Sequence, residues 1–520
     1  MRKGGCCFMS NNSTLNKIRD LIKCSNYKRL GRCFESSRNK YFYDLGTGKV
    51  FQIEEEVQKL LQLILCEDWK EAELCSEDAI HNVYNTILEE EILQAPELKE
   101  YIGAQVYDLN SKLNNNRAQI TLELTEKCNM RCKYCIYQDG QGGYREFGSN
   151  EMTFEIARLA IDDLMKNSAD EKSVFVSFYG GEPLLKFELI KECVSYCEKI
   201  KNKNISYAIT TNGTLINEEM ATFFANLGDR MHITVSLDGP KYMNDKYRVY
   251  SNDKGTFEDV VRGIKLLVKK FNEAGKELSL GINSVLSEYE QDDLNNIESF
   301  FKNQAWIPKE TVYTSSFVST KDREMDYLGV DSEAETELIE NSKKIKGYFD
   351  PLFDWAKDDK GQDITSKLIA KDNMIKELAM IHRRLLFKHP MKYYYMCGCC
   401  VPGARRVYVT TRGDYLICEK LGEAPNIGNV YKGLDIGKIK RIYVDDYCEK
   451  TKEFCNDCWA VHLCGMCYMN CYDKDGINLK LRHSKCIMNR IYIEKNLELY
   501  HELLESNSQV ISVLNDYDFS

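Results

Sequence analysis

The sequence is poor in the features that mark several protein classes. Only 8 of its 520 residues are proline, and its formal net charge at pH 7 is -10. With 43% apolar and 29% charged residues, the composition is that of an ordinary globular protein and excludes a fibrous or disordered chain. A nucleic-acid-binding surface would require a basic patch, which an acidic balance does not support. We therefore expect no nucleic-acid partner.

The sequence also lacks a long apolar run. The first ten residues, MRKGGCCFMS, have no apolar core of a secretory signal. No segment supplies the roughly 18 consecutive apolar residues that a membrane-spanning helix needs. These absences predict a cytoplasmic protein with no membrane contact.

Cysteine, in contrast, is abundant, with 22 residues. Disulfides are rare in the reducing cytoplasm and are needed mainly by much smaller domains. Clustered cysteines in this chain therefore indicate metal or iron–sulfur ligation. Four isolated ones in helical-looking stretches are expected to be plain buried thiols: Cys66, Cys75, Cys193 and Cys197.

Residues 1–112 are predicted to form a first unit. An aromatic run at 41–43, a glycine turn and the apolar run 50–53 indicate a hairpin, after which apolar residues follow helical spacing over 57–64 and in two segments within 68–92. A hairpin followed by helices resembles the winged-helix-like element, related to the quinone-cofactor chaperone, that holds leader peptides of ribosomally made natural products. A plain capping domain is the alternative.

Residues 113–330 alternate between strand-like and helix-like segments. Six strand patterns begin near residues 120, 174, 207, 232, 278 and 312, and helical patterns separate most of them. This order predicts an α/β fold, a partial (β/α)6 barrel whose chemistry belongs at the carboxyl ends of the strands. Residues 331–390 are predicted to be a helical bridge, and 391–520 a cysteine-rich domain that closes with a helix over 487–507.

Three cysteines stand directly after the first barrel strand, in the spacing Cys128-x3-Cys132-x2-Cys135. Such short spacings on a loop let three thiolates converge on one cluster. Three ligands around four irons leave one iron open to a substrate or cofactor. The motif therefore predicts an iron–sulfur centre at the carboxyl edge of the sheet.

This motif in this position resembles the radical S-adenosylmethionine (SAM) superfamily. The resemblance implies a [4Fe-4S] cluster whose open iron is chelated by SAM, and reductive cleavage of SAM to a 5′-deoxyadenosyl radical. It also implies cofactor contacts from Tyr134 near the adenine and from Gly180, Gly181 and Glu182 near the amino group. Further candidates are Ser236 and Asp238 near the ribose, and Arg248 near the carboxylate. As structural alternatives, these residues could form turns or surface ion pairs.

The carboxyl-terminal cysteines form a second dense group. Paired Cys-x2-Cys motifs also bind zinc, which is the alternative here. Their order resembles the SPASM extension of radical SAM enzymes, which implies two auxiliary [4Fe-4S] clusters. By this resemblance the inner cluster is held by Cys397, Cys400 and Cys418, and the outer one by Cys455, Cys458, Cys464 and Cys486. For the fourth inner ligand, Cys467 is preferred over Cys471, because it stands nearer the expected position; Cys399 is either spare or replaces a neighbour.

The combination of these units resembles maturases of ribosomally synthesised peptides. It implies a precursor peptide with a leader sequence, an external electron donor of flavodoxin or ferredoxin type, and thioether formation between a cysteine sulfur and a peptide carbon in a cysteine-rich precursor. Alternatives are sulfatase maturation, carbon–carbon cross-linking, or a zinc-binding adaptor. Glu419 is a candidate base, because the sulfatase-maturing branch has an acidic residue there, or else a surface carboxylate.

Overall fold

The computed structural model describes residues 11–24, 28–138, 145–287, 289–317, 346–347, 349–357, 364–396, 398–506 and 509–518. No helix in these ranges has the length and apolar character needed to cross a bilayer.

The amino-terminal unit is a three-stranded antiparallel sheet with helices. Its elements are α1 (Asn11–Cys24), β1 (Gly31–Glu35), β2 (Lys40–Asp44), β3 (Val50–Ile53), α2 (Glu55–Leu65), α3 (Trp69–Ala72) and α4 (Glu77–Glu90). The predicted hairpin is β2–β3, with Phe42 opposite Phe51, and the predicted helices are α2 to α4. Strand β1 and helix α1 were not predicted. Apolar side chains of α1, α2 and α4 pack with Phe42 into a core of their own.

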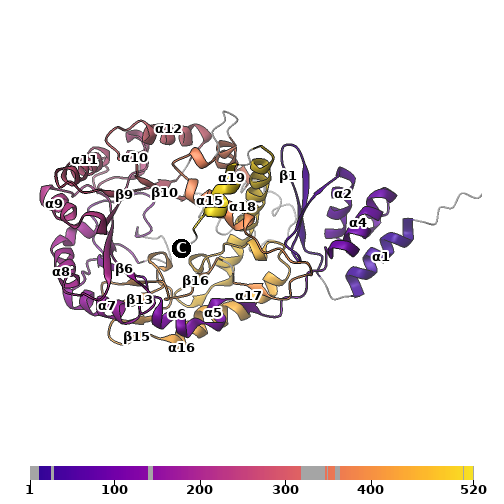
Figure 1. Ribbon diagram of the computed structural model, residues 1–520, viewed down its shortest axis with the longest axis horizontal. Helices are drawn as coiled ribbons and strands as arrows, with labels where there is room; N and C mark the ends of the chain where they lie inside the picture. The colour runs from indigo at the N-terminus through magenta and orange to yellow at the C-terminus, as the bar shows by residue number, and fades with distance from the viewer. Residues whose placement is uncertain are drawn as a thin grey trace, which may run out of the picture.

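Six parallel strands form the barrel sheet in the order β10-β9-β8-β7-β6-β5. They are β5 (Gln119–Thr125), β6 (Ser173–Gly180), β7 (Asn204–Thr211), β8 (Met231–Ser236), β9 (Ser279–Leu286) and β10 (Val312–Phe317). The helices between them are α7 (Phe154–Lys166), α8 (Phe187–Cys197), α9 (Glu218–Leu227), α10 (Lys241–Tyr247), α11 (Phe257–Glu273) and α12 (Gln291–Lys302), and they cover the outside of the sheet (Figure 1). The predicted α/β barrel is confirmed. Only the short α10 was not predicted.

The barrel sheet continues into the carboxyl-terminal region. Strand β12 (Arg406–Val409) pairs in parallel with β5, and the sheet goes on through β13 (Asp414–Leu416), β14 (Gly428–Asn429) and β15 (Gly433–Leu434). The result is one ten-stranded sheet. Sequence patterns did not predict this pairing, which joins the carboxyl-terminal region to the edge of the barrel sheet.

The longer of the remaining helices lie between the barrel and the amino-terminal unit (Figure 1). The longer helices are α15 (Lys371–His382), α17 (Asp446–Asn456), α18 (Leu479–Ser506) and α19 (Gln509–Asp516). The short ones are β4 (Tyr101–Ile102), α5 (Ala104–Tyr107), α6 (Leu109–Asn115), β11 (Tyr394–Tyr395), α16 (Ile436–Ile439), β16 (Tyr472–Asp473) and β17 (Gly476–Ile477). The predicted closing helix is α18, which begins eight residues earlier than expected and so includes Cys486. Most of the first predicted bridge helix, over 335–348, lies outside the described residues.

Buried cysteines follow the prediction in part. Cys75, Cys193 and Cys197 are buried, as expected; the last two lie on the inner face of α8, and Cys75 lies in the bend before α4. Cys66 is exposed, contrary to the expectation, because it caps the carboxyl end of α2 instead of lying on its buried face.

Asp44 is the polar centre of the amino-terminal unit. Its carboxylate is fully buried and accepts hydrogen bonds from the Thr47 N–H, the Thr47 hydroxyl and the Leu93 N–H, each at 2.8 Å. The side chain thereby closes the β2–β3 turn and ties it to the segment after α4.

Replacing Asp44 with alanine should destabilise this unit. Two buried N–H groups would lose their acceptor, at about 1–3 kcal/mol each. Thermal unfolding followed by circular dichroism should show a lower midpoint temperature for the first transition in D44A than in D20A. The D20A control removes an exposed carboxylate from α1. Equal midpoint temperatures in the two variants would contradict the stabilising role of Asp44.

Candidate functional site

A cavity of about 1060 Å³ lies at the carboxyl ends of the barrel strands. Residues from the ends or following loops of all six strands line it, including Tyr179, Asn212, Ser236, Asn283 and Ser315. On the other side its walls come from α15, α18 and the segments after β13 and around Met466. The predicted location of the chemistry, at this edge of the sheet, is thus where the structure has its large cavity.

The cysteine loop after β5 is fixed by backbone hydrogen bonds. The N–H groups of Arg131 and Lys133 donate to the carbonyls of Val249 and Tyr247 at 2.7 and 2.8 Å, and the Cys135 N–H donates to the Cys132 carbonyl at 3.0 Å. The segment before α11 therefore holds the loop in place from the outside.

Cys128, Cys132 and Cys135 all line the cavity. Burial, then Glu182 and then the other two thiols raise the pKa of Cys128 to about 12. The three thiols thus lie within electrostatic range of one another, as ligands of a shared cluster must.

The glycines after β6 permit a close backbone contact. A Cβ on Gly180, whose φ is +135°, would lie 2.4 Å from the Thr125 carbonyl oxygen, and one on Gly181 would lie 2.2 Å from that of Lys127. The sequence suggested that these glycines admit a ligand. The structure shows that they also admit the cysteine loop, because Gly181 and Glu182 donate to the Thr125 and Lys127 carbonyls at 2.8 and 2.9 Å.

Glu182 is committed to the framework of the site. Its buried carboxylate accepts from the Leu184 N–H at 3.0 Å, the Asn212 N–H at 2.8 Å and the Thr211 hydroxyl at 2.7 Å. Gly180 and Gly181 line the cavity, whereas Glu182 is absent from the described lining. The carboxylate holds the ends of β6 and β7 together, which the sequence did not reveal.

Tyr134, Asp238 and Arg248 form a buried chain of hydrogen bonds. Arg248 donates through Nη1 to the Tyr134 hydroxyl at 2.8 Å, and this hydroxyl donates to Asp238 at 2.7 Å. Asp238 also accepts from the Val285 N–H at 3.0 Å. Tyr134, Arg248 and Ser236 line the cavity, and Asp238 supports them from behind.

These residues fit the predicted cofactors. Three thiols converge beside the cavity, and Arg248 Nε is buried there with no hydrogen-bond partner among the described residues. A buried donor without an acceptor is costly, so an acceptor from a bound molecule would satisfy it. A carboxylate is the natural partner of a guanidinium.

The inner set of carboxyl-terminal cysteines comes together around the loop after β13. Burial, then Glu419, and less strongly Cys467, raise the pKa of Cys418 to about 12. Burial also raises the pKa of Cys467, with Cys400 acting in the same direction. Cys418, Cys467 and Cys400 are thus neighbours, while Cys397 lies outside the described residues.

The outer set gathers beside the start of α18. Burial raises the pKa of Cys464 and Cys486, and the thiols of Cys455 and Cys458 raise both further. Cys471 is near members of both sets, because the thiols of Cys486 and Cys467 both raise its pKa, and it donates to the Cys467 carbonyl at 3.3 Å. Within the described ranges no three His, Cys, Asp or Glu side chains could hold a single metal ion. The assignment of ligands to clusters stays a prediction.

Glu419 lines the cavity, with its carboxylate 3.4 Å from the Arg406 guanidinium.

Other residues at or beside the cavity were missed by sequence reasoning. Arg145 pairs with buried Glu123 at 2.5 Å and stacks 3.9 Å from the Tyr137 ring, which lines the cavity. Lys376 and Glu377 on α15 line the opposite wall. Of these residues, only Tyr137 could have been suspected from the sequence, because it is an aromatic residue two positions after the last cysteine of the motif.

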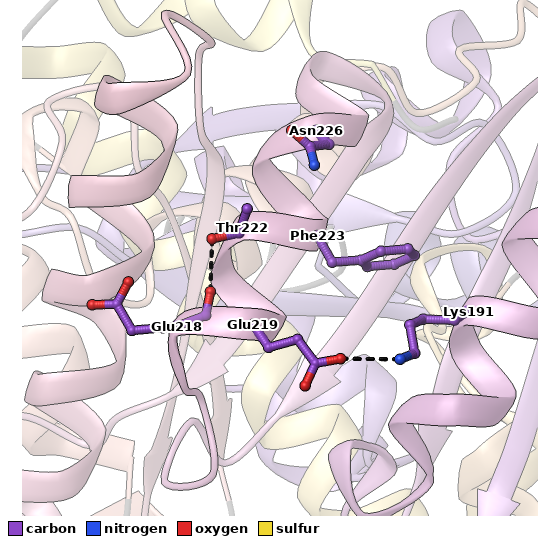
Figure 2. A pocket seen from close by; sticks show the side chains of 6 residues that line it. All are labelled: Lys191, Glu218, Glu219, Thr222, Phe223 and Asn226. Atoms are coloured by element: carbon purple, nitrogen blue, oxygen red, sulfur yellow. Dashed lines mark hydrogen bonds and ion pairs between the residues drawn. The ribbon is translucent and has the colours of Figure 1, made fainter.

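A second depression lies on the outer helices α8 and α9 (Figure 2). It has a volume of about 420 Å³, and Lys191 on α8 meets Glu219 on α9 across it at 3.0 Å (Figure 2). This ion pair joins two barrel helices, and none of the predicted site residues lines the depression.

Comparison with known proteins identifies the barrel. Residues 122–293 match the family model described as the radical SAM superfamily. This part of the chain is a radical SAM domain. The family implies one [4Fe-4S] cluster and SAM as cofactors, which agrees with the cysteine loop.

Two curated relatives extend the comparison. The cysteine-type anaerobic sulfatase-maturating enzyme of Clostridium novyi is 31% identical over 188 residues, which are 35% of this chain and 46% of that protein. The radical SAM cyclopropyl synthase TigE of Paramaledivibacter caminithermalis is 24% identical over 266 residues, 48% of this chain and 54% of that one. The chain thus spans about half the length of the curated relatives it matches.

The fold also resembles that of a solved enzyme. Native anSMEcpe with bound AdoMet and Kp18Cys peptide aligns over 77% of this chain and 100% of that one, with 18% identity and a TM-score of 0.51. The likeness thus extends beyond the radical SAM domain into the amino- or carboxyl-terminal parts of the chain.

Substituting Gly181 with alanine should disturb the cysteine loop. The added Cβ would lie 2.2 Å from the Lys127 carbonyl oxygen, so the loop would have to move. Anaerobic purification followed by iron analysis should show about four fewer irons per chain than in the wild type, the content of one cluster. The matched control is G437A, whose Cβ would make only an ordinary 3.6 Å contact. Full iron content in G181A would contradict this account.

Proposed function

We propose that this radical SAM enzyme is a peptide maturase, which forms thioether links between cysteine sulfur and a peptide carbon in a cysteine-rich ribosomal precursor. The observation that carries the proposal is that segments bearing the two further cysteine sets form the cavity wall opposite the cysteine loop: Glu419 beside Cys418, and Met466 between Cys464 and Cys467, line the cavity. With all three sets occupied, the chain would hold three [4Fe-4S] clusters, about twelve irons.

The first site would hold the radical-forming cofactors. When bound, the cluster on Cys128, Cys132 and Cys135 and its SAM would supply a 5′-deoxyadenosyl radical. Arg248 would bind the carboxylate of SAM, while Asp238 fixes Tyr134 beside it. Aromatic and aliphatic side chains such as Phe147, Phe317 and Leu352 line the cavity and would exclude water from a reactive intermediate.

The ligands proposed for the two auxiliary clusters are chosen by which cysteines lie near one another. Cys400, Cys418 and Cys467, with Cys397, would hold the inner cluster; Cys455, Cys458, Cys464 and Cys486 would hold the outer one. Cys467 is preferred over Cys471, because Cys467 lies beside both Cys400 and Cys418. The function also needs an external electron donor of flavodoxin or ferredoxin type.

A peptide substrate is supported by two observations. The solved anSMEcpe structure holds a peptide, and the cavity of this chain is large enough for several side chains. The amino-terminal unit would hold the leader sequence. In the described chain, β3 pairs on one side only, with β2, and such an edge can accept an added peptide strand.

Sulfatase maturation is the second candidate. Its support is the identity to the Clostridium novyi enzyme and the position of Glu419 at the cavity, next to Cys418. In that reaction Glu419 would accept a proton from the substrate. The two candidates differ in product: a cross-link between two residues for one, an oxidised single residue for the other.

Reconstituted enzyme should change the mass of its proper substrate in a characteristic way. With a cysteine-rich precursor, SAM and a reductant, we expect a product lighter by two hydrogens per link, with fragmentation blocked between the linked residues. Tandem mass spectrometry measures both. Loss of two hydrogens confined to one residue, with exchange of sulfur for oxygen on hydrolysis where that residue is cysteine, would favour the sulfatase-type reaction. Unchanged mass for every encoded precursor would contradict the proposal.

The first cluster can be tested separately from the substrate. Replacing Cys132 with alanine removes one of three ligands, so production of 5′-deoxyadenosine from SAM should fall to background, measured by liquid chromatography. The control is C193A, which removes a buried thiol from α8 at the outside of the barrel. Wild-type rates in C132A would exclude this loop as the cluster site.

A further inference from the structure

Helix α18 directs polar donors at the outer cysteine set. Arg482 Nη2 lies 3.1 Å from the Cys455 sulfur and Nη1 lies 3.6 Å from the Cys486 sulfur. Two turns further along, Asn489 Nδ2 lies 3.3 Å from the Cys464 sulfur. Three of the four predicted outer ligands thus receive N–H···S contacts from one helix.

Arg482 is unusual because no carboxylate of the described residues forms an ion pair with it. The residue is only 2% exposed, and its neighbours include the two thiols, the Cys471 thiol and the Tyr447 ring, 5.6 Å away. Arginine keeps its charge in proteins. A buried charge without a counter-charge is strongly destabilising.

Deprotonated cysteines would supply the missing negative charge. Cysteines that ligate a cluster are thiolates, and charge-assisted hydrogen bonds from a guanidinium stabilise them. The surroundings of Arg482 therefore suit a liganded outer set better than four neutral thiols.

We propose that Arg482 and Asn489 are positioning residues that raise the reduction potential of the outer auxiliary cluster. This rests on the proposed function, which places that cluster. One-electron reduction adds a negative charge to the cluster, with a chemical reductant as donor in the test below. A guanidinium and an amide donor next to the sulfurs stabilise the more negative, reduced form. The outer cluster is thereby easier to reduce than it would be without these two donors.

The test is a redox titration of the complete enzyme with all its clusters, followed by electron paramagnetic resonance. The signal of the outer cluster is the one that disappears in C455A. In R482M, which keeps an unbranched apolar stem and loses the charged guanidinium, the equilibrium constant for reduction should fall at least tenfold, a shift of about 59 mV to lower potential for one electron. R482K should shift less than half as far. K474M, which removes an exposed charge of the same domain, should leave the potential unchanged.

Failure of this inference is distinguishable from failure of the proposed function. If no wild-type signal is lost in C455A, no outer cluster exists and both are overturned. If the signal is present but R482M leaves its potential unchanged, only the role of Arg482 is overturned. If R482M loses the cluster itself, the test uses N489L, which removes one uncharged donor. A lower reduction potential in N489L, corresponding to a less than tenfold fall in the equilibrium constant for reduction, supports the inference. An unchanged potential overturns it.

Discussion

The pairing of β12 with β5 is the contact on which the arrangement of the site depends. It places β5 between two parallel neighbours, β6 and β12, so the loops that follow these strands leave the sheet at the same edge. The cysteine loop follows β5, the glycine turn follows β6, and the chain after β12 returns through β13 to Cys418. Strand β13 runs antiparallel to β12, so Cys418 does not leave the sheet at this edge, but the neighbouring Glu419 still lines the cavity.

Buried charges in this protein are held by hydrogen bonds, and their partners indicate their tasks. Glu182 and Asp238 accept bonds from backbone N–H groups and from hydroxyls, so they position their neighbours. Arg248 retains a donor without a partner beside the cavity, and Arg482 faces two thiols. The carboxylates are satisfied within the chain, whereas the two guanidinium groups need something the chain alone does not supply.

Helix α18 connects the cysteine region to the amino-terminal unit. Near its start it carries Arg482, Cys486 and Asn489. Further along, Glu494 pairs with Arg32 on β1 at 2.6 Å, and Glu505 accepts from Ser36, in the connection between β1 and β2, at 2.8 Å. His501 packs against Phe34 and Tyr41, with ring centres 5.0 and 4.5 Å apart. A rigid helix thus sets the position of the unit proposed to hold the leader sequence relative to the outer cysteines.

The sequence by itself determined the local elements and the first site. Alternating strand and helix patterns predicted all six barrel strands, since periodicity depends only on neighbours along the chain, and the spacing from Cys128 to Cys135 predicted a site on one short loop. The pairing of β5 with β12, the use of Glu182 as a framework residue and the approach of Arg482 to Cys455 were decided only by the tertiary structure. Each of these joins segments whose own patterns are ordinary, because a contact between distant segments leaves no period in either of them.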